Sequence, residues 1–265
     1  MNLFQSIKRL GLVAAMAVSI SSGAQAGILT GVDILNLTGV TESSLTAGNM
    51  TTARSVLTNE GATITDLAIG SFSAASLSGI DILYVGLTFN GFSNAQIADI
   101  QAYVAAGGGL VAVGTERQCC FGPSWEEVAN SFGLTGLGGD RNVKATATTP
   151  SSPIVNGPYG VATSYAPAAT GAFKSPLPGG ATSVWEGLDD NPVIVTLDVT
   201  GRAFFFADTN FMQNSFIGGG SNSTIWGNAF AFTGRVDPNP VPEPMSLALV
   251  GAALAAAAAV RRRRV

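Results

Sequence analysis

The chain has 265 residues, of which 46% are hydrophobic and only 11% are charged, against about a quarter in ordinary soluble domains. Between residues 27 and 242, seven Lys and Arg stand against sixteen Asp and Glu, a net charge of −9 that argues against binding to nucleic acid. The sequence contains no histidine, which excludes Cys-His and Ser-His nucleophiles and the common His-ligated metal sites. We therefore expect no cofactor and no metal site.

The first 26 residues have the order of a secretory signal peptide. Basic residues precede an apolar run at 10–20, and Ala24 and Ala26 frame a small-residue cleavage site. Cleavage by signal peptidase would leave Gly27 as the first residue of the mature chain. The alternative, a first core helix, explains the apolar run but not the order of the three parts.

Strand and helix patterns alternate over the first half of the remaining chain. Apolar, β-branched runs predict strands, and helical spacing of apolar residues predicts helices between them. The predicted strands are 32–38, 64–67, 80–86 and 110–114, and the predicted helices lie within 47–61, 93–107 and 123–133. Capping boxes mark two helix starts, at Ser93 with Gln96 and at Ser124 with Glu127. This order predicts a parallel sheet with helices on both faces.

The second half is less regular. Strands are predicted at 143–148, 192–199 and 202–207, and the Gly-, Pro- and Ser-rich stretch 149–183 is interpreted mostly as loop. A last helix is predicted at 222–233. We expect residues 27–234 to form one α/β domain, with a flavodoxin-like, doubly wound and mostly parallel sheet flanked by helices.

A linker and a short apolar segment follow this domain. Residues 235–244 are rich in proline, which favours an extended spacer. Residues 247–260 carry no charge and, as a helix, would span roughly 21 Å, whereas a bilayer core is about 30 Å thick. We expect a short transmembrane helix at about 246–260, inserted in the inner membrane, with the arginines after it in the cytoplasm.

The C-terminal 24 residues, 242–265, resemble the PEP-CTERM sorting signal. Its parts occur in order as a Pro-Glu-Pro, an apolar helix and an arginine cluster: Pro242, Glu243, Pro244, then Arg261, Arg262, Arg263 and Arg264. The resemblance implies a Gram-negative bacterium that makes exopolysaccharide, cleavage by an exosortase near the Pro-Glu-Pro, and delivery to the cell surface or extracellular matrix. A plain tail anchor would explain the helix and the arginines but not the Pro-Glu-Pro.

The central domain, over roughly residues 30–234, resembles the class I glutamine amidotransferase-like superfamily. The resemblance is carried by IDILYVG, SNAQIADIQAYVAAGGGLVAVG, SPIVNGPYG, GRAFFFADTNF and TIWGNAFAFTG, in that order. Active members of that superfamily place a cysteine on the turn after a strand. Here the turn after LVAVG reads Thr115-Glu116-Arg117, so we expect the catalytic residues to be missing.

The two cysteines of the chain are adjacent, at Cys119 and Cys120. Export would favour their oxidation. A vicinal disulfide, an intermolecular bridge and two free thiols all remain open, because adjacent residues are poorly placed for an S–S bond.

Ligands of open α/β sheets bind beyond the carboxyl ends of the strands. Polar residues of the predicted loops there form a candidate ligand cleft: Thr88, Asn90, Glu116, Arg117, Asp208 and Asn210. Asp208 and Asn210 have an alternative role in capping the next turn. The acidic triplet 189–191 is interpreted as a solvated turn rather than a calcium site.

These observations leave two classes of function. The first is a non-catalytic surface or matrix protein that binds exopolysaccharide or another envelope protein. The second is a secreted hydrolase that uses Asp or Glu, Ser, or a metal with oxygen ligands. The absence of histidine and of the expected cysteine favours the first.

Overall fold

A computed structural model of the chain describes residues 27–40, 42–87, 91–115, 126–139 and 141–236. The predicted signal peptide, both cysteines, the Pro-Glu-Pro and the arginine cluster lie outside these ranges. Within them, no helix is long and apolar enough to cross a membrane. The predicted membrane helix at about 246–260 lies outside the described residues.

The centre of the domain is a seven-stranded sheet in the order β2-β1-β3-β4-β11-β10-β9. Its strands are β1 (Asp33–Thr38), β2 (Thr63–Ala68), β3 (Ile82–Val85), β4 (Gly109–Val113), β9 (Ala181–Glu186), β10 (Pro192–Asp198) and β11 (Arg202–Phe206). Neighbours from β2 to β11 pair in parallel, whereas β10 pairs antiparallel with both β11 and β9. The predicted mostly parallel sheet is confirmed.

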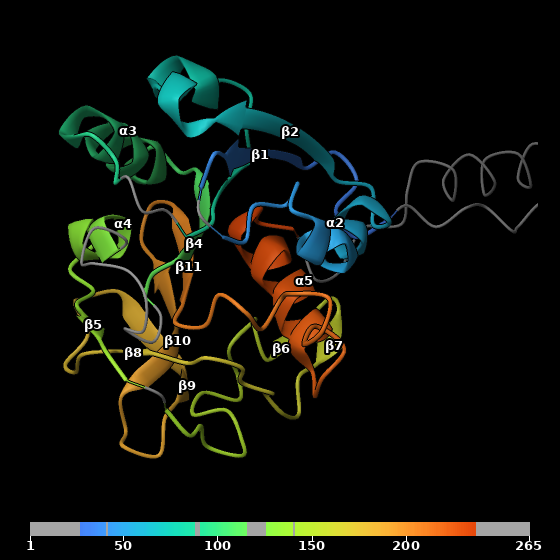
Figure 1. Cartoon of the computed structure of the whole chain (residues 1–265), viewed down its shortest axis with the longest axis vertical. Coiled ribbons are helices and arrows are strands. Elements are labelled where there is room, and N and C mark those ends of the chain that lie inside the picture. Colours follow the sequence, from blue (N-terminus) through green and yellow to red (C-terminus); the bar gives the residue numbers. More distant parts are fainter. Residues whose placement is uncertain (1–26, 41, 88–90, 116–125, 140, 237–265) are drawn as a thin grey trace, which may run out of the picture.

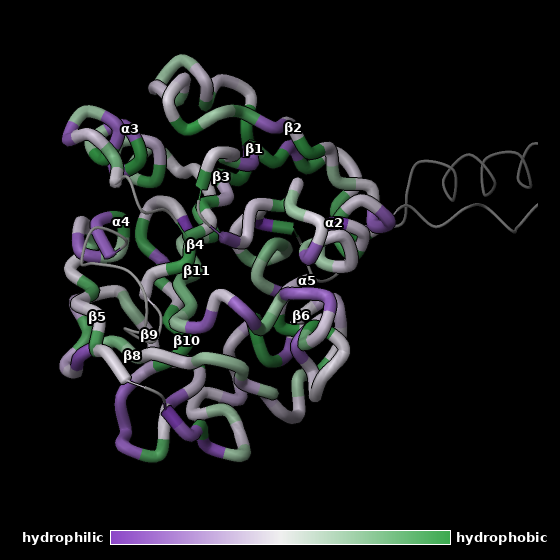
Figure 2. The backbone as a smooth tube through the Cα atoms, in the orientation of Figure 1, coloured by the Kyte–Doolittle hydropathy of each residue, from purple (hydrophilic) through white to green (hydrophobic). Residues whose placement is uncertain are grey.

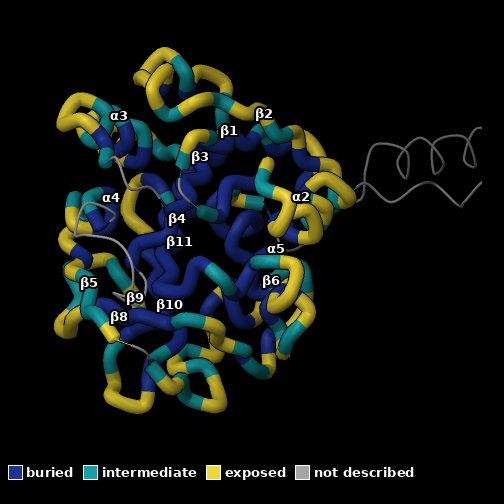
Figure 3. Tube along the Cα trace, viewed as in Figure 1, coloured by how far each residue is buried: buried dark blue, intermediate teal, exposed yellow. Residues whose placement is uncertain are grey.

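Helices cover both faces of the sheet (Figure 1). One face carries α2 (Thr51–Thr58) and α5 (Asn222–Thr233), and the other carries α3 (Asn94–Ala105) and α4 (Glu127–Ser131). Three short 3-10 helices lie at Gly48–Met50, Ile69–Ser71 and Ala74–Leu77. Figure 2 shows hydrophobic residues gathered along the central strands, and Figure 3 shows the same strands buried. A doubly wound sheet buries its strands on both faces, which explains their continuous apolar runs.

Local signals set the helices of the first half. Met50, Ala53 and Leu57 are fully buried on one side of α2, and Gly61 follows with φ of 90°, a backbone conformation that favours glycine. The Ser93 hydroxyl accepts the backbone N–H of Gln96 at the start of α3, as the predicted capping box requires. These predictions are confirmed.

Helix α5 has the predicted bounds but is buried over ten of its twelve residues instead of along one stripe. It packs between the sheet, α2 and a small antiparallel hairpin of β6 (Asn156–Gly157) and β7 (Gly160–Val161). The Trp226 indole donates to the Ala53 carbonyl at 3.0 Å, and the Asn228 amide donates to two carbonyls of the hairpin region. Neighbours on several sides therefore replace solvent around most of this helix.

One predicted strand differs from the structure. Residues 143–148 are not a regular strand, although Lys144 and Thr148 donate backbone hydrogen bonds to the edge strand β9. The stretch 149–183 is mostly loop, as predicted, and also contains the short strands β6, β7 and β8 (Ala172–Phe173, paired with β5 at Gly136–Leu137) and the start of β9. Helix α4 begins at Glu127, whose carboxylate accepts the N–H of Phe92. Ser124, the other residue of the predicted capping box, lies outside the described residues.

Both ends of the described chain lie at the amino edge of the sheet. Gly27 sits against Glu60, just before β2, and Thr233 at the end of α5 approaches Gly109 at the start of β4. The strands β1, β3, β4 and β11 end at the opposite, carboxyl edge.

Candidate functional site

The structure describes two of the six residues predicted to line a ligand cleft. Asp208 and Asn210 both follow β11 and lie together at the carboxyl edge. Thr88, Asn90, Glu116 and Arg117 lie outside the described residues.

Asp208 is fully buried and serves as an internal anchor. Its carboxylate accepts hydrogen bonds from the hydroxyls of Tyr165 (2.8 Å) and Thr170 (2.9 Å) and from the backbone N–H of Ala168 (2.7 Å), Ala169 (3.3 Å) and Asn210 (3.0 Å). Because both carboxylate oxygens have donors, Asp208 joins residues 165–170 to the end of β11 and presents no free oxygen to a ligand. The bond from Asn210 is the turn-capping contact that the sequence offered as the alternative role.

The loop after β1 closes the point where strand order reverses, between β1 and β3. Glu42 and Leu87 exchange backbone hydrogen bonds of 3.0 and 3.1 Å across this point. The buried Ser43 has φ of 62°, an uncommon conformation for a residue other than glycine. The Tyr84 hydroxyl donates to the Ser43 carbonyl at 2.6 Å. The Ser43 hydroxyl contacts Thr209, which follows β11.

This arrangement has a chemical consequence. The described parts of the loops that follow β1, β3 and β11 are thereby tied to one another at the position where many open α/β sheets hold ligands. Burial raises the pKa of the Glu42 carboxyl and also that of the Tyr84 phenol. The sequence carried no signal for the Ser43–Thr209 contact, because serine and threonine are common in loops.

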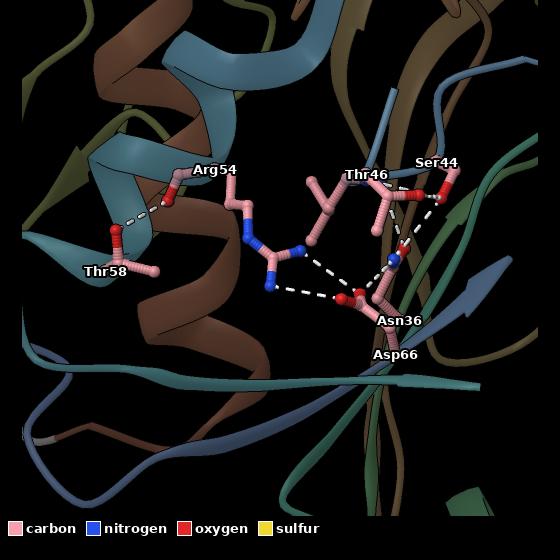
Figure 4. Close-up of polar contacts among 7 residues, drawn as sticks. Asn36, Ser44, Thr46, Arg54, Thr58 and Asp66 are labelled. Carbon is pink, nitrogen blue, oxygen red and sulfur yellow. Dashed lines mark hydrogen bonds and ion pairs between the residues drawn. The ribbon is translucent and has the colours of Figure 1, made fainter. Parts of the chain in front are cut away.

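A polar cluster lies beside this loop, between β1, β2 and α2 (Figure 4). We define the β1–β2 polar cluster as Asn36, Ser44, Thr46, Arg54 and Asp66. The Asp66 carboxylate accepts two bonds from the Arg54 guanidinium, at 3.1 and 3.2 Å, and one of 2.7 Å from the Asn36 amide. Asn36 also donates to Ser44 (3.3 Å), which contacts the Thr46 hydroxyl at 2.9 Å.

The members of this cluster differ in exposure. Asn36 is fully buried, whereas the Arg54 and Asp66 side chains are 29% and 34% exposed and Thr46 lies at the surface. Buried contacts therefore fix the positions of groups that still reach solvent. Sequence reasoning missed this cluster, because its residues come from four separate segments.

The other side of the carboxyl edge carries two acidic residues on adjacent positions. The nearly buried Glu126 accepts a 3.1 Å bond from the Thr115 hydroxyl, and Glu127 accepts the N–H of Phe92 at 2.9 Å. The two carboxylates have different partners, so they do not form a catalytic pair. In the part of the chain that the structure describes, no three acidic or cysteine side chains gather as metal ligands.

The acidic triplet between β9 and β10 forms a turn. Asp189 contacts Arg141, and Asp190 pairs with Lys144 at 2.7 Å. Asn191 bonds back to the Asp189 carboxylate. These contacts agree with the turn interpretation.

Two shallow pockets lie at the amino edge, away from the predicted cleft. The first, of about 300 Å³, is lined by residues that include Asp81, Tyr103 and Arg235. The second, of about 250 Å³, is lined by residues that include Asp198 and Arg202. Of the residues predicted for the ligand cleft, the two that the structure describes, Asp208 and Asn210, line neither pocket.

Comparison with known proteins identifies the fold. Neither a protein-family model nor a curated protein matches the sequence. Among solved structures, the N-terminal domain of mmIFT52 is 13% identical with a TM-score of 0.59, covering 80% of this chain and 100% of that one. A cytoplasmic protein from Salmonella typhimurium LT2 is 18% identical with a TM-score of 0.53, covering 76% and 100%.

A ThuA-like structure is also similar. A putative ThuA-like protein from Parabacteroides merdae is 14% identical with a TM-score of 0.52, covering 80% of this chain and 93% of its own. A glutamine amidotransferase from Thermotoga maritima matches at 15% identity, but its TM-score of 0.40 is too low to support an argument. At these identities the likeness concerns the fold alone: the described domain shares the α/β fold of the structures from mmIFT52, Salmonella typhimurium LT2 and Parabacteroides merdae.

Proposed function

We propose that the protein is an exported surface or matrix protein, processed by signal peptidase and an exosortase, whose α/β domain binds exopolysaccharide without catalysis. Passage through the inner membrane is transient in this proposal, and the mature domain is retained at the cell surface or in the extracellular matrix. Another envelope protein is the alternative partner.

The observation that carries the proposal is the separation of the two edges of the sheet. Gly27 and Val236, the ends of the described chain, adjoin the segments that resemble sorting signals, and both lie at the amino edge. The β1–β2 polar cluster and the loops around Ser43 belong to the carboxyl half. A domain held by its ends would therefore direct this polar edge outward.

The chemistry of the β1–β2 polar cluster suits a sugar ligand. A guanidinium, a carboxylate and a hydroxyl reach solvent together, at Arg54, Asp66 and Thr46. Sugar hydroxyls both donate and accept hydrogen bonds, so they can pair with all three groups. Because Asn36 and Ser44 fix this arrangement from below, little side-chain freedom would be lost on binding.

Sorting is tested by the intact mass of the native protein from the envelope and from the medium. The proposal expects a chain that starts at Gly27 and ends near the Pro-Glu-Pro. A mass that still includes Arg261 to Arg264 would instead identify a tail-anchored protein and contradict exosortase processing.

Binding is tested by co-sedimentation of the protein with exopolysaccharide from the same cells. Replacing both Arg54 and Thr46 by alanine should weaken binding by about tenfold or more. A tenfold change in affinity corresponds to about 1.4 kcal/mol of binding free energy. The matched control is Arg202→Ala, which removes a similar half-exposed ion pair with Asp198 at the opposite edge. Equal binding by the double variant and the wild type would exclude this surface.

The hydrolase alternative has one supporting observation, the nearly buried Glu126 carboxyl against Thr115. Release of reducing ends from the exopolysaccharide by the wild type, and its loss in Glu126→Gln, would replace the binding proposal by an enzyme.

A further inference from the structure

The residue that follows the predicted signal cleavage site, Gly27, sits directly against Glu60. We propose that removal of the signal peptide creates an α-ammonium group at Gly27 that binds the Glu60 carboxylate. The folded domain would then contain a preformed binding site for its own mature N-terminus. This inference rests on the export part of the proposed function.

Steric contact makes position 27 specific for glycine. A Cβ atom added at Gly27 would lie 2.3 Å from the carbonyl oxygen of Glu60, 2.4 Å from its carbonyl carbon and 2.7 Å from its Cα. All three are backbone atoms, and that carbonyl is held by the N–H of Leu29 at 2.8 Å. Any side chain at position 27 would therefore separate the two segments.

The carboxylate of Glu60 already faces the start of the mature chain. Its Oε2 accepts the backbone N–H of Ile28 at 2.9 Å, and a turn bond of 3.0 Å from Thr30 to the Gly27 carbonyl holds this segment in place. The α-nitrogen of Gly27 is the next backbone nitrogen from that of Ile28. Among the described residues, no side chain or backbone group donates to Glu60 Oε1, and no Lys or Arg pairs with Glu60.

Cleavage changes the charge at this place. Signal peptidase adds water across the Ala26–Gly27 peptide bond, so that Ala26 leaves with a new carboxylate and Gly27 keeps the nitrogen as an amine. This amine is protonated at neutral pH, with an ordinary pKa of about 7.7 to 8.0. The uncharged amide of the precursor thus becomes a cation one residue from the point where Glu60 binds the chain.

One other titratable group belongs to this neighbourhood. The Tyr159 hydroxyl is buried without a hydrogen-bond partner, and burial, followed by the negative charge of Glu60, raises the pKa of its phenol. Tyr159 therefore stays neutral over the pH range in which the amine titrates. The new ammonium is the only group in this set that would compensate the charge of Glu60.

The test compares chains that differ at the N-terminus and at position 60. One chain begins at Gly27 and the other keeps residues 22–26, both continue to Val265, and each is made with Glu60 and with Glu60→Gln. We expect Glu60→Gln to lower the Tm by about 2 °C more in the chain that begins at Gly27. The Glu60 carboxylate would raise the pKa of the amine in the folded state. Stability from such a pair is present at low pH and is lost as pH rises through the pKa of the amine in the folded state. The excess loss of Tm in the chain that begins at Gly27 should therefore vanish above about pH 9.

Glu127→Gln is the matched control, because Glu127 accepts the Phe92 N–H at the same distance of 2.9 Å. Its effect should be the same in both chains. An equal effect of Glu60→Gln in both chains, or an excess that persists at pH 10, would overturn the inference. These chains are made without export, so the two parts of the proposal can fail separately. If the chains show the expected excess but the native protein retains its signal peptide, export is rejected, whereas the binding of an N-terminal ammonium group by Glu60 is not.

Discussion

The hydroxyl of Tyr165 donates a 2.8 Å hydrogen bond to the carboxylate of Asp208, 43 residues further along the chain. This bond joins the irregular segment before β8 to the end of the central strand β11. It also gives a structural role to an acidic residue at the carboxyl edge of an α/β sheet. Asp208 stands where a ligand-binding carboxylate is expected, but its hydrogen bonds are used to hold the fold together.

Asp208→Asn should destabilise the domain by about 2 kcal/mol or more. The amide replaces one acceptor oxygen by an NH₂ group that faces other donors, which leaves buried groups unsatisfied. Chemical denaturation of the variant and the wild type measures the change. Asp190→Asn is the control, since the Asp190 side chain is 80% exposed and its ion pair should contribute little. A similar, small effect for both variants would contradict the anchoring role of Asp208.

Gly227→Ala should destabilise the protein although alanine favours helices. Alanine gains about 1 kcal/mol in helix propensity, but its Cβ would lie 2.3 to 2.6 Å from ring atoms of Tyr159, which packs over α5. Overpacking of this kind costs about 1 to 3 kcal/mol, so the net effect is a lower denaturation midpoint. Gly48→Ala, where nothing lies within 4 Å of the added atom, should change the midpoint little. A stabilised Gly227→Ala variant would show that the hairpin moves freely away from α5.

Asn36→Ala should cost more stability than Arg54→Ala. Asn36 is fully buried, and its amide bonds Ser44, Asp66 and the N–H of Leu45, so its loss should cost about 2 kcal/mol. Arg54 forms a partly exposed ion pair that should contribute less than about 1 kcal/mol and less still in high salt. Denaturation in low and high salt measures both effects, and the reverse order would mean that the ion pair holds the β1–β2 polar cluster.

Glu42→Gln should stabilise the domain near neutral pH and have little effect in acid. Burial raises the pKa of the Glu42 carboxyl above its ordinary value of 4.5, so the folded state disfavours its charged form. The wild type therefore loses stability as pH rises from about 4.5 through the raised value, whereas glutamine stays neutral. The gain should be below about 1 kcal/mol, because the group is partly exposed. Thermal unfolding from pH 4 to 8 tests this, and a gain that is equal at both ends of the range would rule out titration as its cause.

The sequence by itself determined the order of most elements and several of their boundaries. Helix α3 begins where the capping box of Ser93 and Gln96 places it, and α5 spans the predicted 222–233. The strands β1, β3, β4, β10 and β11 follow from short apolar runs. These signals succeed because capping and the periodicity of apolar residues act between positions a few residues apart.

Only the tertiary structure decided the edge strand β9, the nearly complete burial of α5 and the role of Asp208. Residues 181–186 lack a strong apolar run and become a strand because they pair with β10. Helix α5 is buried over ten of its twelve residues because the β6–β7 hairpin covers the side that a two-layer packing would leave in water. Four of the five donors to Asp208 come from residues 165–170, about forty positions earlier. Whether a polar side chain faces a ligand or its own chain depends on such distant partners, which local sequence patterns do not encode.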